Sequence, residues 1–477
     1  RQMCIRDRAI LERVLITSSR WFIRRRIIRV IDEISSRIDI QIKPFQLTKR
    51  QVLIDRLVYD PKVLETIQQT ARERECPLEI VQREVMSYAR EIVPSFNAYL
   101  YFRIGYWIAK KIARLLYRVR IGISGDEQFS SIDPESTVVF VINHRSNMDY
   151  VLVAFLAAEK TTLSYAVGEW AKIWPLQTLI RAMGAFFVRR NSSDPLYRCV
   201  LERYVHMATK EGVCQAVFLE GGLSRDGRLR QPKLGFLDYM LRSYDPAKDR
   251  DIVFIPVGVN YDRTLEDRSL LRELDPGAEN RSSWFVIKTT CGFIWKSLIL
   301  MVLSRWQRFG YAYVNFGNPV SVRQYGKENS LDFKKLERSA RFLEVENFAG
   351  RLMEAIKQVI PALPVSLVAT VMLESDPKGM RAFEVQTQVN RLIADLQDDG
   401  AHVYVSTRQP VESILNALNM LVLRRLVQES QGIYSIIPAE LGVLSYYANA
   451  IAHWRHDFPG ANGPLHQKSN AGANNGA

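Results

Sequence analysis

A histidine and an aspartate five residues apart form a pair that could carry proton-transfer chemistry. His144 follows the apolar run 137–142, and Asp149 stands at the start of the next helical pattern. On one continuous helix, residues five apart point roughly 140° away from each other, but across a strand–turn–helix junction they can meet. Asp149 would then hold one ring nitrogen of His144 while the other nitrogen takes a proton from an alcohol.

A structural interpretation of the same residues stays open. The spacing of Ser146 and Asp149 is close to that of a capping box, in which Asp149 only caps the start of a helix. A histidine at the end of a strand can also be a hydrogen-bonded structural residue.

Three further segments bear on this choice. Residues 184–190 form a short apolar run that ends in two arginines, which alone is typical of a solvated strand edge. Residues 218–227 run from a strand into a glycine pair followed by Ser224 and Arg225. Backbone amides at such a turn can approach an oxyanion or phosphate, and Arg225 can bind phosphate with two donors, although plain hairpins contain similar turns. Residues 255–261 alone indicate an ordinary strand.

Taken in order, the four segments resemble the motifs of the glycerol-3-phosphate acyltransferases, within the glycerolipid acyltransferase superfamily. The matching positions are His144 and Asp149 (His-x4-Asp), Gly184, Phe187 and Arg190 (Gly-x-x-Phe-x-x-Arg), Glu220, Gly221, Ser224 and Arg225 (Glu-Gly-x-x-Ser-Arg), and Pro256 in a hydrophobic run. The resemblance extends to residues 260–263 and 444–453 and covers about 96–456. One departure is Leu223, where the best-known bacterial members carry a basic residue; Lys233 or Arg228 could supply that contact.

The resemblance implies a mechanism without metal, cofactor or covalent enzyme intermediate. His144 would act as general base and Asp149 as its orienting carboxylate. The substrate-binding positions would be Gly184, Phe187, Arg190, Glu220, Gly221, Ser224, Arg225 and Pro256, with the two arginines on the phosphate. The expected reaction moves a fatty acyl group from acyl-CoA or acyl-carrier protein, as co-substrate, to the sn-1 hydroxyl of glycerol 3-phosphate. The product is lysophosphatidic acid, and the step is the first of phospholipid synthesis.

Two rival functions remain at this stage. A dihydroxyacetone-phosphate or lysophosphatidate acyltransferase would share the His-x4-Asp chemistry and differ in its pocket. A non-enzymatic basic protein that binds lipid or nucleic acid would not respond to the loss of His144, and it leaves the ordered motifs unexplained. Nucleic acid is therefore not an expected partner.

The elements that must position these residues indicate an α/β fold. Short apolar runs at 137–142, 216–219, 252–255 and 311–316 read as strands, with 150–159 and other helical patterns between them. This alternation predicts a mainly parallel sheet flanked by helices, as in glycerolipid acyltransferases. We expect a basic helical N-terminal region at 1–95, a catalytic domain at 96–360, a smaller α/β C-terminal domain at 361–458 and a disordered tail at 459–477. Within the C-terminal domain, 384–396 and 411–427 read as helices and 402–406 as a strand.

The charge distribution indicates an anionic membrane surface. The net charge is +14, and the first 31 residues hold nine arginines against two acidic residues. Residues 20–31 mix arginines with Trp21 and Phe22, as in a helix lying in the lipid interface; a solvated basic helix is the alternative. Aromatic and basic residues mix again at 96–120. The apolar stretch 285–303 carries Lys288 and Lys296, which disfavours a spanning helix. We expect a peripheral or monotopic protein on the cytoplasmic face of the inner membrane, bound to anionic lipids.

The remaining polar residues suggest no second centre. None of the five cysteines forms a C-x-x-C pair, which favours a reducing compartment and neither a disulfide framework nor a zinc site. The other histidines lack a partner pattern and are expected to be structural or solvated: His206, His402, His453, His456 and His466.

Overall fold

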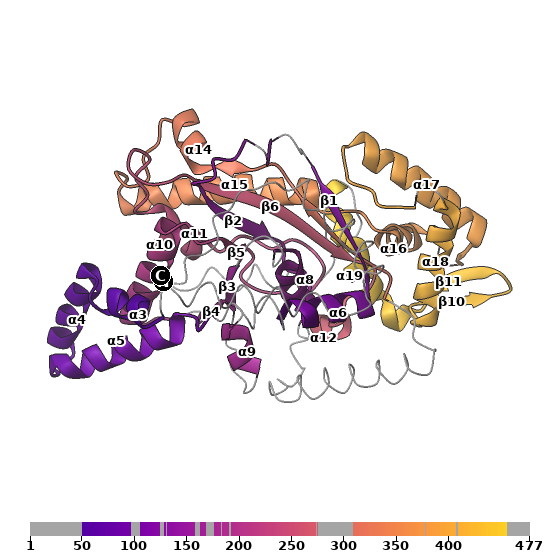
Figure 1. Ribbon diagram of the computed structural model, residues 1–477. Helices are drawn as coiled ribbons and strands as arrows, with labels where there is room; N and C mark the ends of the chain where they lie inside the picture. The colour runs from indigo at the N-terminus through magenta and orange to yellow at the C-terminus, as the bar shows by residue number, and fades with distance from the viewer. Residues whose placement is uncertain are drawn as a thin grey trace, which may run out of the picture.

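A mixed sheet of eight strands forms the centre of the protein (Figure 1). The structure, a computed structural model, describes residues 50–96, 105–124, 128–129, 131–157, 163–167, 176–182, 184–189, 192–272, 274, 309–376, 378–406 and 409–455. The strands are β1 (Arg118–Ile123), β2 (Thr137–Ile142), β3 (Ser164–Val167), β4 (Ala185–Phe187), β5 (Gln215–Phe218), β6 (Ile252–Tyr261), β7 (Tyr311–Phe316) and β8 (Val320–Ser321).

Most neighbouring strands run parallel. The order is β1-β7-β6-β2-β5-β3-β4, with β8 beside β6. Only the pairs β6–β7 and β6–β8 are antiparallel. Strands β2 and β6 lie in the middle, where Val141 is paired with Pro256, and every residue of both strands is buried. Continuous apolar runs of this kind are typical of strands covered on both faces. The predicted fold class is therefore confirmed.

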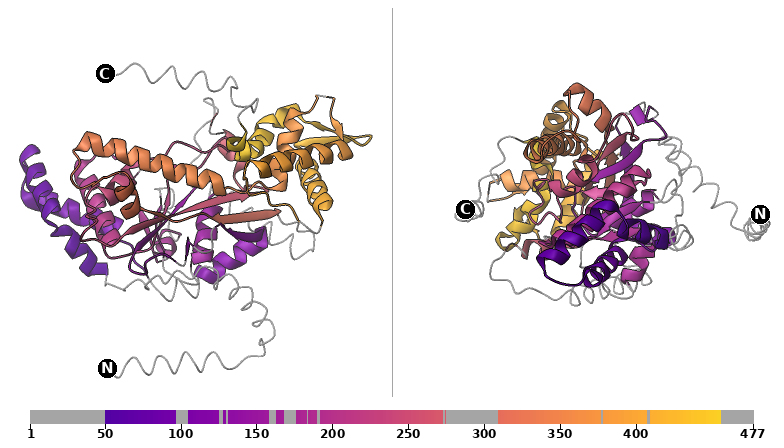
Figure 2. Two further views of the ribbon diagram at one scale, coloured as in Figure 1. Left: turned by 90° about the horizontal axis from the view of Figure 1, so that it is seen from above. Right: turned by 90° about the vertical axis from the view of Figure 1, so that its left-hand side faces the viewer.

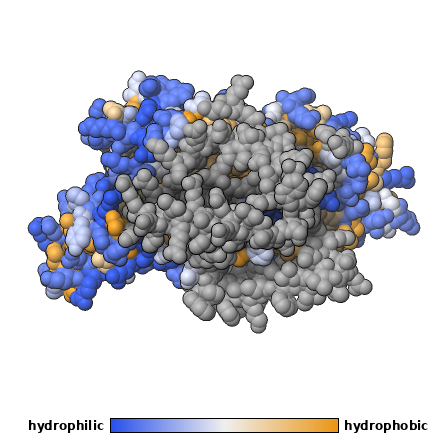
Figure 3. All heavy atoms as spheres, viewed as in Figure 1, coloured by the Kyte–Doolittle hydropathy of each residue, from blue (hydrophilic) through white to orange (hydrophobic). Residues whose placement is uncertain are grey.

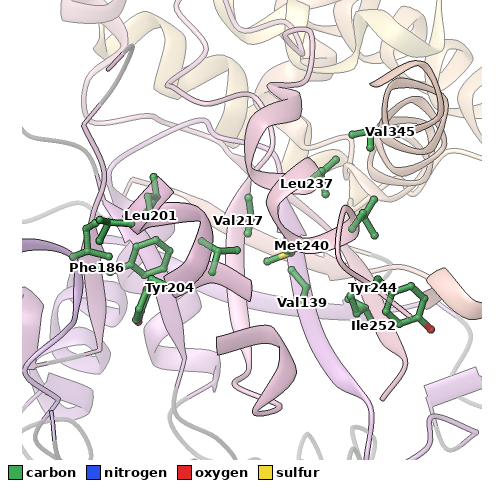
Figure 4. Close-up of a cluster of buried hydrophobic side chains, with 14 of the residues drawn as sticks. Val139, Phe186, Leu201, Tyr204, Val217, Leu237, Met240, Tyr244, Ile252 and Val345 are labelled. Carbon is green, nitrogen blue, oxygen red and sulfur yellow. The ribbon is translucent and has the colours of Figure 1, made fainter. Parts of the chain in front are cut away.

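Helices cover both faces of the sheet. Helix α6 (Tyr106–Leu116) directly precedes β1, and the helices that come after strands are α8 (Met148–Ala157), α9 (Leu176–Ala182), α10 (Pro195–Lys210), α11 (Leu234–Leu241), α12 (Asp267–Arg272), α14 (Val322–Glu328) and α15 (Arg338–Val359). Because side chains alternate along a strand, β2 sends Val139 and Val141 into the core shared with α10, α11 and α15. It sends Phe140 and Ile142 into the opposite core, shared with α6 and α8. Figure 4 shows the first core, in which Val139 and Val217 of the sheet and Met240 of α11 belong to one cluster of buried side chains.

Three further helices precede α6 in the chain. These are α3 (Arg50–Val58), α4 (Pro61–Glu73) and α5 (Leu78–Ile92), and all three contact α10. Asp60 has two roles at this contact: its carboxylate accepts a hydrogen bond from the Lys62 amide as the N-cap of α4, and it forms an ion pair with Arg203 of α10 at 2.8 Å. The expected helical N-terminal region is confirmed for this part. Figure 3 shows hydrophilic side chains with scattered hydrophobic ones over these helices at the lower left.

A second, smaller unit follows α15. Its helices are α16 (Pro364–Glu374), α17 (Ala382–Asp398), α18 (Pro410–Leu423) and α19 (Leu441–Ala448), with 3-10 helices η3 (Pro438–Glu440) and η4 (Asn449–Trp454). Its strands β9 (Met380–Arg381), β10 (Val427–Ser430) and β11 (Ile433–Ile436) form an antiparallel sheet in the order β10-β11-β9. Helix α16 lies at its centre and is buried from Pro364 to Met372. Figure 2 shows this unit and the N-terminal helices at opposite ends of the large sheet.

Three local expectations need correction. The predicted strand at 402–406 is wrong, because Val403 forms only an isolated bridge with Ala362. The helix predicted for 411–427 ends at Leu423, and Val427 begins β10. The stretch 96–120 is not one basic helix, since α6 ends at Leu116 and Arg118 and Arg120 lie in β1.

Several expectations lie outside the described residues, namely the interfacial helix at 20–31, the apolar stretch 285–303 and the tail at 459–477. The boundaries predicted at 95, 360 and 458 stay predictions. Across the part of the chain that the structure describes, none of the helices combines the length and the hydropathy needed to cross a membrane.

Candidate active site

The loop that holds His144 begins where β2 ends. Strand β2 finishes at Ile142, and the Asn143 side chain continues its pairing with β6. The amide nitrogen of Asn143 donates to the Val259 carbonyl at 2.9 Å, and its oxygen accepts from the Val259 N–H at 2.7 Å. The Asn143 side chain thus makes to Val259 the same pair of hydrogen bonds that a backbone residue of a neighbouring strand would make. It therefore fixes the point at which the chain turns away from the sheet towards α8.

His144 and Asp149 meet across this turn. The distance from His144 Nδ1 to Asp149 Oδ2 is 2.9 Å, and the two side chains are 3% and 0% exposed. Asp149 Oδ2 also accepts from the backbone N–H groups of Arg145 at 2.8 Å and Ser146 at 3.0 Å. Ser146 Oγ in turn accepts from the Met148 N–H at 3.1 Å. The capping arrangement and the contact with histidine are thus both present, and one carboxylate takes part in both.

The imidazole of His144 lies between aromatic rings. Phe218 stacks on it with ring centroids 4.0 Å apart, and Tyr150 meets it edge-on at 5.3 Å. Because a carboxylate at Nδ1 can only accept, Nδ1 carries the proton and the lone pair stands on Nε2. Among the residues that the structure describes, none bonds to Nε2. A ring held in this tautomer can take a proton from an alcohol.

Glu220 ties the glycine-rich segment to the histidine loop. Its Oε1 accepts from the His144 N–H at 2.9 Å, and its Oε2 accepts from the Arg230 N–H at 2.9 Å. The Ser224 N–H donates to the His144 carbonyl at 2.9 Å. Burial raises the pKa of Glu220 to about 7, although the two N–H donors act in the opposite direction. Glu220 therefore braces the backbone around His144 and joins it to the glycine-rich segment.

The rest of this segment forms a compact turn. Gly221 has a φ of +66°, and a Cβ there would lie 2.7 Å from Cγ of Lys233. Ser224 Oγ donates to the Arg228 carbonyl at 2.6 Å, so its hydroxyl stabilises the turn itself. Arg225 is exposed at the tip of the turn. Among the motif positions Glu220, Gly221, Ser224 and Arg225, Arg225 is the charged residue that is exposed.

The other predicted positions are more scattered. Gly184 directly precedes β4, and Phe187 at the end of β4 is fully buried, with the Arg181 guanidinium 5.0 Å from its ring centroid. Pro256 lies inside β6 and is buried. Arg190 lies outside the described residues. Leu223, the departure from the family pattern, packs against the hydrophobic core of the C-terminal unit.

The C-terminal unit also reaches the histidine loop, which the sequence did not indicate. Arg145 is 4% exposed, its Nη1 donates to the Gly227 carbonyl at 2.5 Å, and its guanidinium lies 4.9 Å from the Tyr446 ring centroid. Tyr446 Oη donates to the Arg145 carbonyl at 3.2 Å, and Asn449 of η4 donates to the Asp226 carbonyl at 2.8 Å. The sequence offered two signals for this contact across 301 residues: Arg145 stands beside His144, and Tyr446 lies in the segment 444–453 that carries the family resemblance.

Two further side chains, one from β6 and one from the turn after it, form hydrogen bonds with the loop that holds His144. Tyr261 Oη donates to Asp149 Oδ1 at 2.5 Å. Ser146 Oγ donates to Glu266 Oε2 at 2.7 Å. Burial and, to a smaller extent, the charge of Asp149 raise the pKa of Glu266 to about 7. Both residues were missed as site residues, although Tyr261 stands in the segment 260–263 that carries the family resemblance.

The remaining described histidines lie away from this pair. Burial lowers the pKa of His206 and of His402. His453 contacts the Lys357 carbonyl at 3.0 Å, and burial lowers its pKa to about 4. His456 and His466 fall outside the described residues. Within the residues that the structure describes, no group of three or more His, Cys, Asp or Glu could hold a metal ion.

Two regions of the chain match known protein families. Residues 120–260, which contain the histidine loop and the glycine-rich turn, match the acyltransferase family. Residues 297–455 match the glycerol-3-phosphate acyltransferase C-terminal region. The site therefore lies in the first matched region, and Tyr446 contacts it from the second.

Individual relatives agree with these matches. A glycerol-3-phosphate acyltransferase of Pseudomonas entomophila is 28% identical over 85% of this chain and 49% of its own length. One of Shewanella pealeana is 26% identical over 86% of this chain and 50% of its own, and one of Pseudomonas putida is 30% identical over 69% and 39%. The chain thus spans about half the length, or less, of the curated relatives that it matches. A solved 1-acyl-sn-glycerophosphate acyltransferase of Thermotoga maritima is 15% identical, with a TM-score of 0.30, over 64% of this chain and 97% of its own.

The mainly parallel sheet and the match over residues 120–260 define an acyltransferase domain. With the second match and the relatives that extend over most of the chain, the particular family follows. The chain belongs to the bacterial glycerol-3-phosphate acyltransferase family.

Proposed function

We propose that this protein transfers a fatty acyl group from an acyl thioester to the sn-1 hydroxyl of glycerol 3-phosphate. The observation that carries the proposal is the buried pair of His144 and Asp149, 2.9 Å apart at the end of β2. In open α/β sheets, active sites lie beyond the carboxyl ends of the strands. Membership of the glycerol-3-phosphate acyltransferase family supports the choice of acceptor.

His144 acts as general base in this proposal. Its Nε2 takes the proton of the primary hydroxyl as that oxygen attacks the thioester carbonyl carbon. The C–S bond of the resulting tetrahedral intermediate then breaks, and the leaving thiolate takes the proton back from the imidazolium. Asp149 keeps the ring oriented and stabilises its charged form. The reaction needs no covalent bond to the enzyme, and its product is 1-acyl-glycerol 3-phosphate.

The phosphate of the acceptor is assigned to Arg225 and Arg190. Arg225 is supported by its exposed position on the turn that bonds to the backbone of His144. A guanidinium suits this role because it stays charged and offers planar paired donors. Arg190 is assigned from the family pattern alone, because it lies outside the described residues. Gly221 allows the turn, while Glu220 and Ser224 hold its shape.

Acyl-CoA and acyl-carrier protein both remain donors in the proposal. Their thioesters are chemically alike, and the exposed cations Arg225, Arg230 and Lys233 beside the histidine loop suit the phosphates that each donor carries. The protein itself is placed on the cytoplasmic face of the inner membrane. Its charge of +14 supports this, as does the exposed Trp107 beside Lys111 on α6.

An acceptor competition assay tests the proposal against its closest rivals. Purified protein would receive radiolabelled glycerol 3-phosphate with palmitoyl-CoA or palmitoyl-carrier protein, and labelled product would be extracted into organic solvent. Unlabelled dihydroxyacetone phosphate and lysophosphatidate would be added as competitors. We expect labelled lysophosphatidate to form and neither competitor to suppress it at equal concentration. Acylation of a competitor without acylation of glycerol 3-phosphate would replace the proposed acceptor.

A further inference from the structure

We propose that Tyr261 is a positioning residue for acyl transfer, acting through the carboxylate of Asp149. This inference rests on the proposed function, since it assigns Tyr261 to the same histidine–aspartate pair. Tyr261 is the last residue of β6 and is fully buried. Its Oη donates to Asp149 Oδ1 at 2.5 Å, on the carboxylate oxygen that does not face His144.

The need for such a residue follows from the other bonds of Asp149. Its Oδ2 accepts from the His144 ring and from two backbone N–H groups of the loop. These three donors all belong to the loop that the carboxylate has to hold, so they cannot fix the carboxylate to the rest of the fold. Tyr261 supplies the one described bond from Asp149 to the central sheet. Through this hydrogen bond, strand β6 fixes the position of the Asp149 carboxylate and so the orientation of the His144 imidazole.

The surroundings keep Tyr261 a permanent donor. Burial raises its pKa well above the ordinary value for tyrosine, and the charge of Asp149 acts in the same direction. The phenol therefore stays protonated throughout the range in which an enzyme works. Its ring is held by Tyr117, whose centroid lies 5.2 Å away and whose own hydroxyl donates to the Arg263 carbonyl at 2.7 Å.

Three neighbouring hydrogen bonds indicate that β6 and the turn after it hold the loop. Asn143 bonds both backbone groups of Val259, and Ser146 bonds Glu266 in the turn after β6. The loop is thus bonded to residues 259–266 at Asn143 before the histidine–aspartate pair, at Ser146 between its two members, and at Asp149 itself. Of these fastenings, only the Tyr261 bond reaches a group that contacts the catalytic imidazole.

Replacement of the hydroxyl alone tests the inference. Tyr261→Phe keeps the buried ring and leaves Asp149 Oδ1 without its donor. Loss of a hydrogen bond to a charged group should lower kcat roughly tenfold or more. The Michaelis constants for glycerol 3-phosphate and for the acyl donor should stay within about twofold, since ground-state binding is untouched.

Tyr117→Phe is the matched control. It also removes a buried hydroxyl from the same core, but that hydroxyl bonds a backbone carbonyl and does not touch Asp149. We expect its kcat to equal that of the unaltered protein even if its thermal midpoint falls as far as that of Tyr261→Phe. Suppose that the unaltered protein acylates glycerol 3-phosphate and that His144→Ala abolishes this activity. Equal kcat values for Tyr261→Phe and Tyr117→Phe would then overturn the inference about Tyr261 and leave the proposed function standing. Absence of activity in the unaltered protein would instead overturn the proposed function.

Discussion

At the scale of single residues, two buried carboxylates support His144 in different ways. Asp149 bonds the imidazole itself and takes hydrogen bonds on both of its oxygens. Glu220 bonds only backbone N–H groups, those of His144 and Arg230. Two such bonds offset the cost of burying its charge only in part, and its pKa is accordingly raised from 4.5 to about 7.

The raised pKa of Glu220 predicts a pH-dependent stability. A carboxyl group with a folded-state pKa above its unfolded value stabilises the fold fully below about 4.5, and this contribution is lost as pH rises through about 7. At about 1.4 kcal/mol per pKa unit, the loss is at most about 3.5 kcal/mol. Glu220→Gln removes the titrating group. The unfolding free energy of the unaltered protein, minus that of this variant, should therefore decrease between pH 5 and pH 8.

Denaturant unfolding at the two pH values measures this difference. Glu346→Gln is a suitable control, because Glu346 is exposed on α15 and should leave the pH dependence unchanged. A constant difference between the unaltered protein and Glu220→Gln across this range would show that Glu220 stays ionised in the fold.

The residues of this centre were predictable to different degrees. His144 and Asp149 are five apart, so a local turn brings them together and their spacing was informative. Tyr261 and Tyr446 bond the same loop from 112 and 301 residues away. No periodicity in the sequence records such pairings, because they depend on strand register and on how a separate unit docks.

At the scale of elements, apolar runs long enough for a buried strand were identified correctly, as β2 and β7 show. The failure at 402–406 has a specific cause. A strand needs a partner segment, and the neighbour of Val403 is Ala362. Pro361 on one side lacks an N–H group, and Pro364 on the other begins α16. Only Ala362 and Leu363 lie between the two prolines, and Leu363 is the N-cap of α16, so a segment with strand-like composition remains a single bridge.

The seam between the glycine-rich turn and α19 is closely packed. Gly227 has a φ of +87°, and a Cβ there would lie 2.0 Å from the Tyr446 carbonyl oxygen. Gly227→Ala should therefore push α19 away from the turn and lower the unfolding free energy by at least about 3 kcal/mol. Activity should fall with it, because Tyr446 bonds the loop of His144.

Gly235→Ala is the matched control for this seam. Gly235 lies in α11 and would meet nothing within 4 Å if it carried a Cβ. Alanine there should leave the thermal midpoint unchanged or raise it slightly. Similar thermal midpoints and activities for Gly227→Ala and the unaltered protein would contradict the docking of α19 against the turn.

At the scale of the whole molecule, the distribution of charge predicts membrane binding. Half of the net charge of +14 lies in the first 31 residues. Each cationic side chain near an anionic surface contributes about 1 kcal/mol. Replacement of Arg24, Arg25, Arg26 and Arg29 by glutamine should therefore weaken binding to vesicles that contain phosphatidylglycerol. The activity on detergent-solubilised substrate should persist, because the sheet and the histidine loop are unchanged.

Vesicle flotation at low and high salt measures this binding. Aromatic residues such as Trp107, which is 59% exposed on α6, should retain part of the unaltered protein on the vesicles in high salt. Equal flotation of the unaltered protein and the glutamine variant would contradict the electrostatic part of the proposal. Complete release by salt would contradict the aromatic part.

The central claim, that His144 is the base of a glycerol-3-phosphate acyltransferase, is tested most directly by one turnover measurement. The rate of acyl transfer to radiolabelled glycerol 3-phosphate would be compared for the unaltered protein, His144→Ala and His206→Ala, with folding checked by circular dichroism. Loss of a general base should lower turnover by about 100-fold or more in His144→Ala, whereas His206→Ala, altered on α10, should keep its rate. Near-normal turnover in a folded His144→Ala protein would contradict the account.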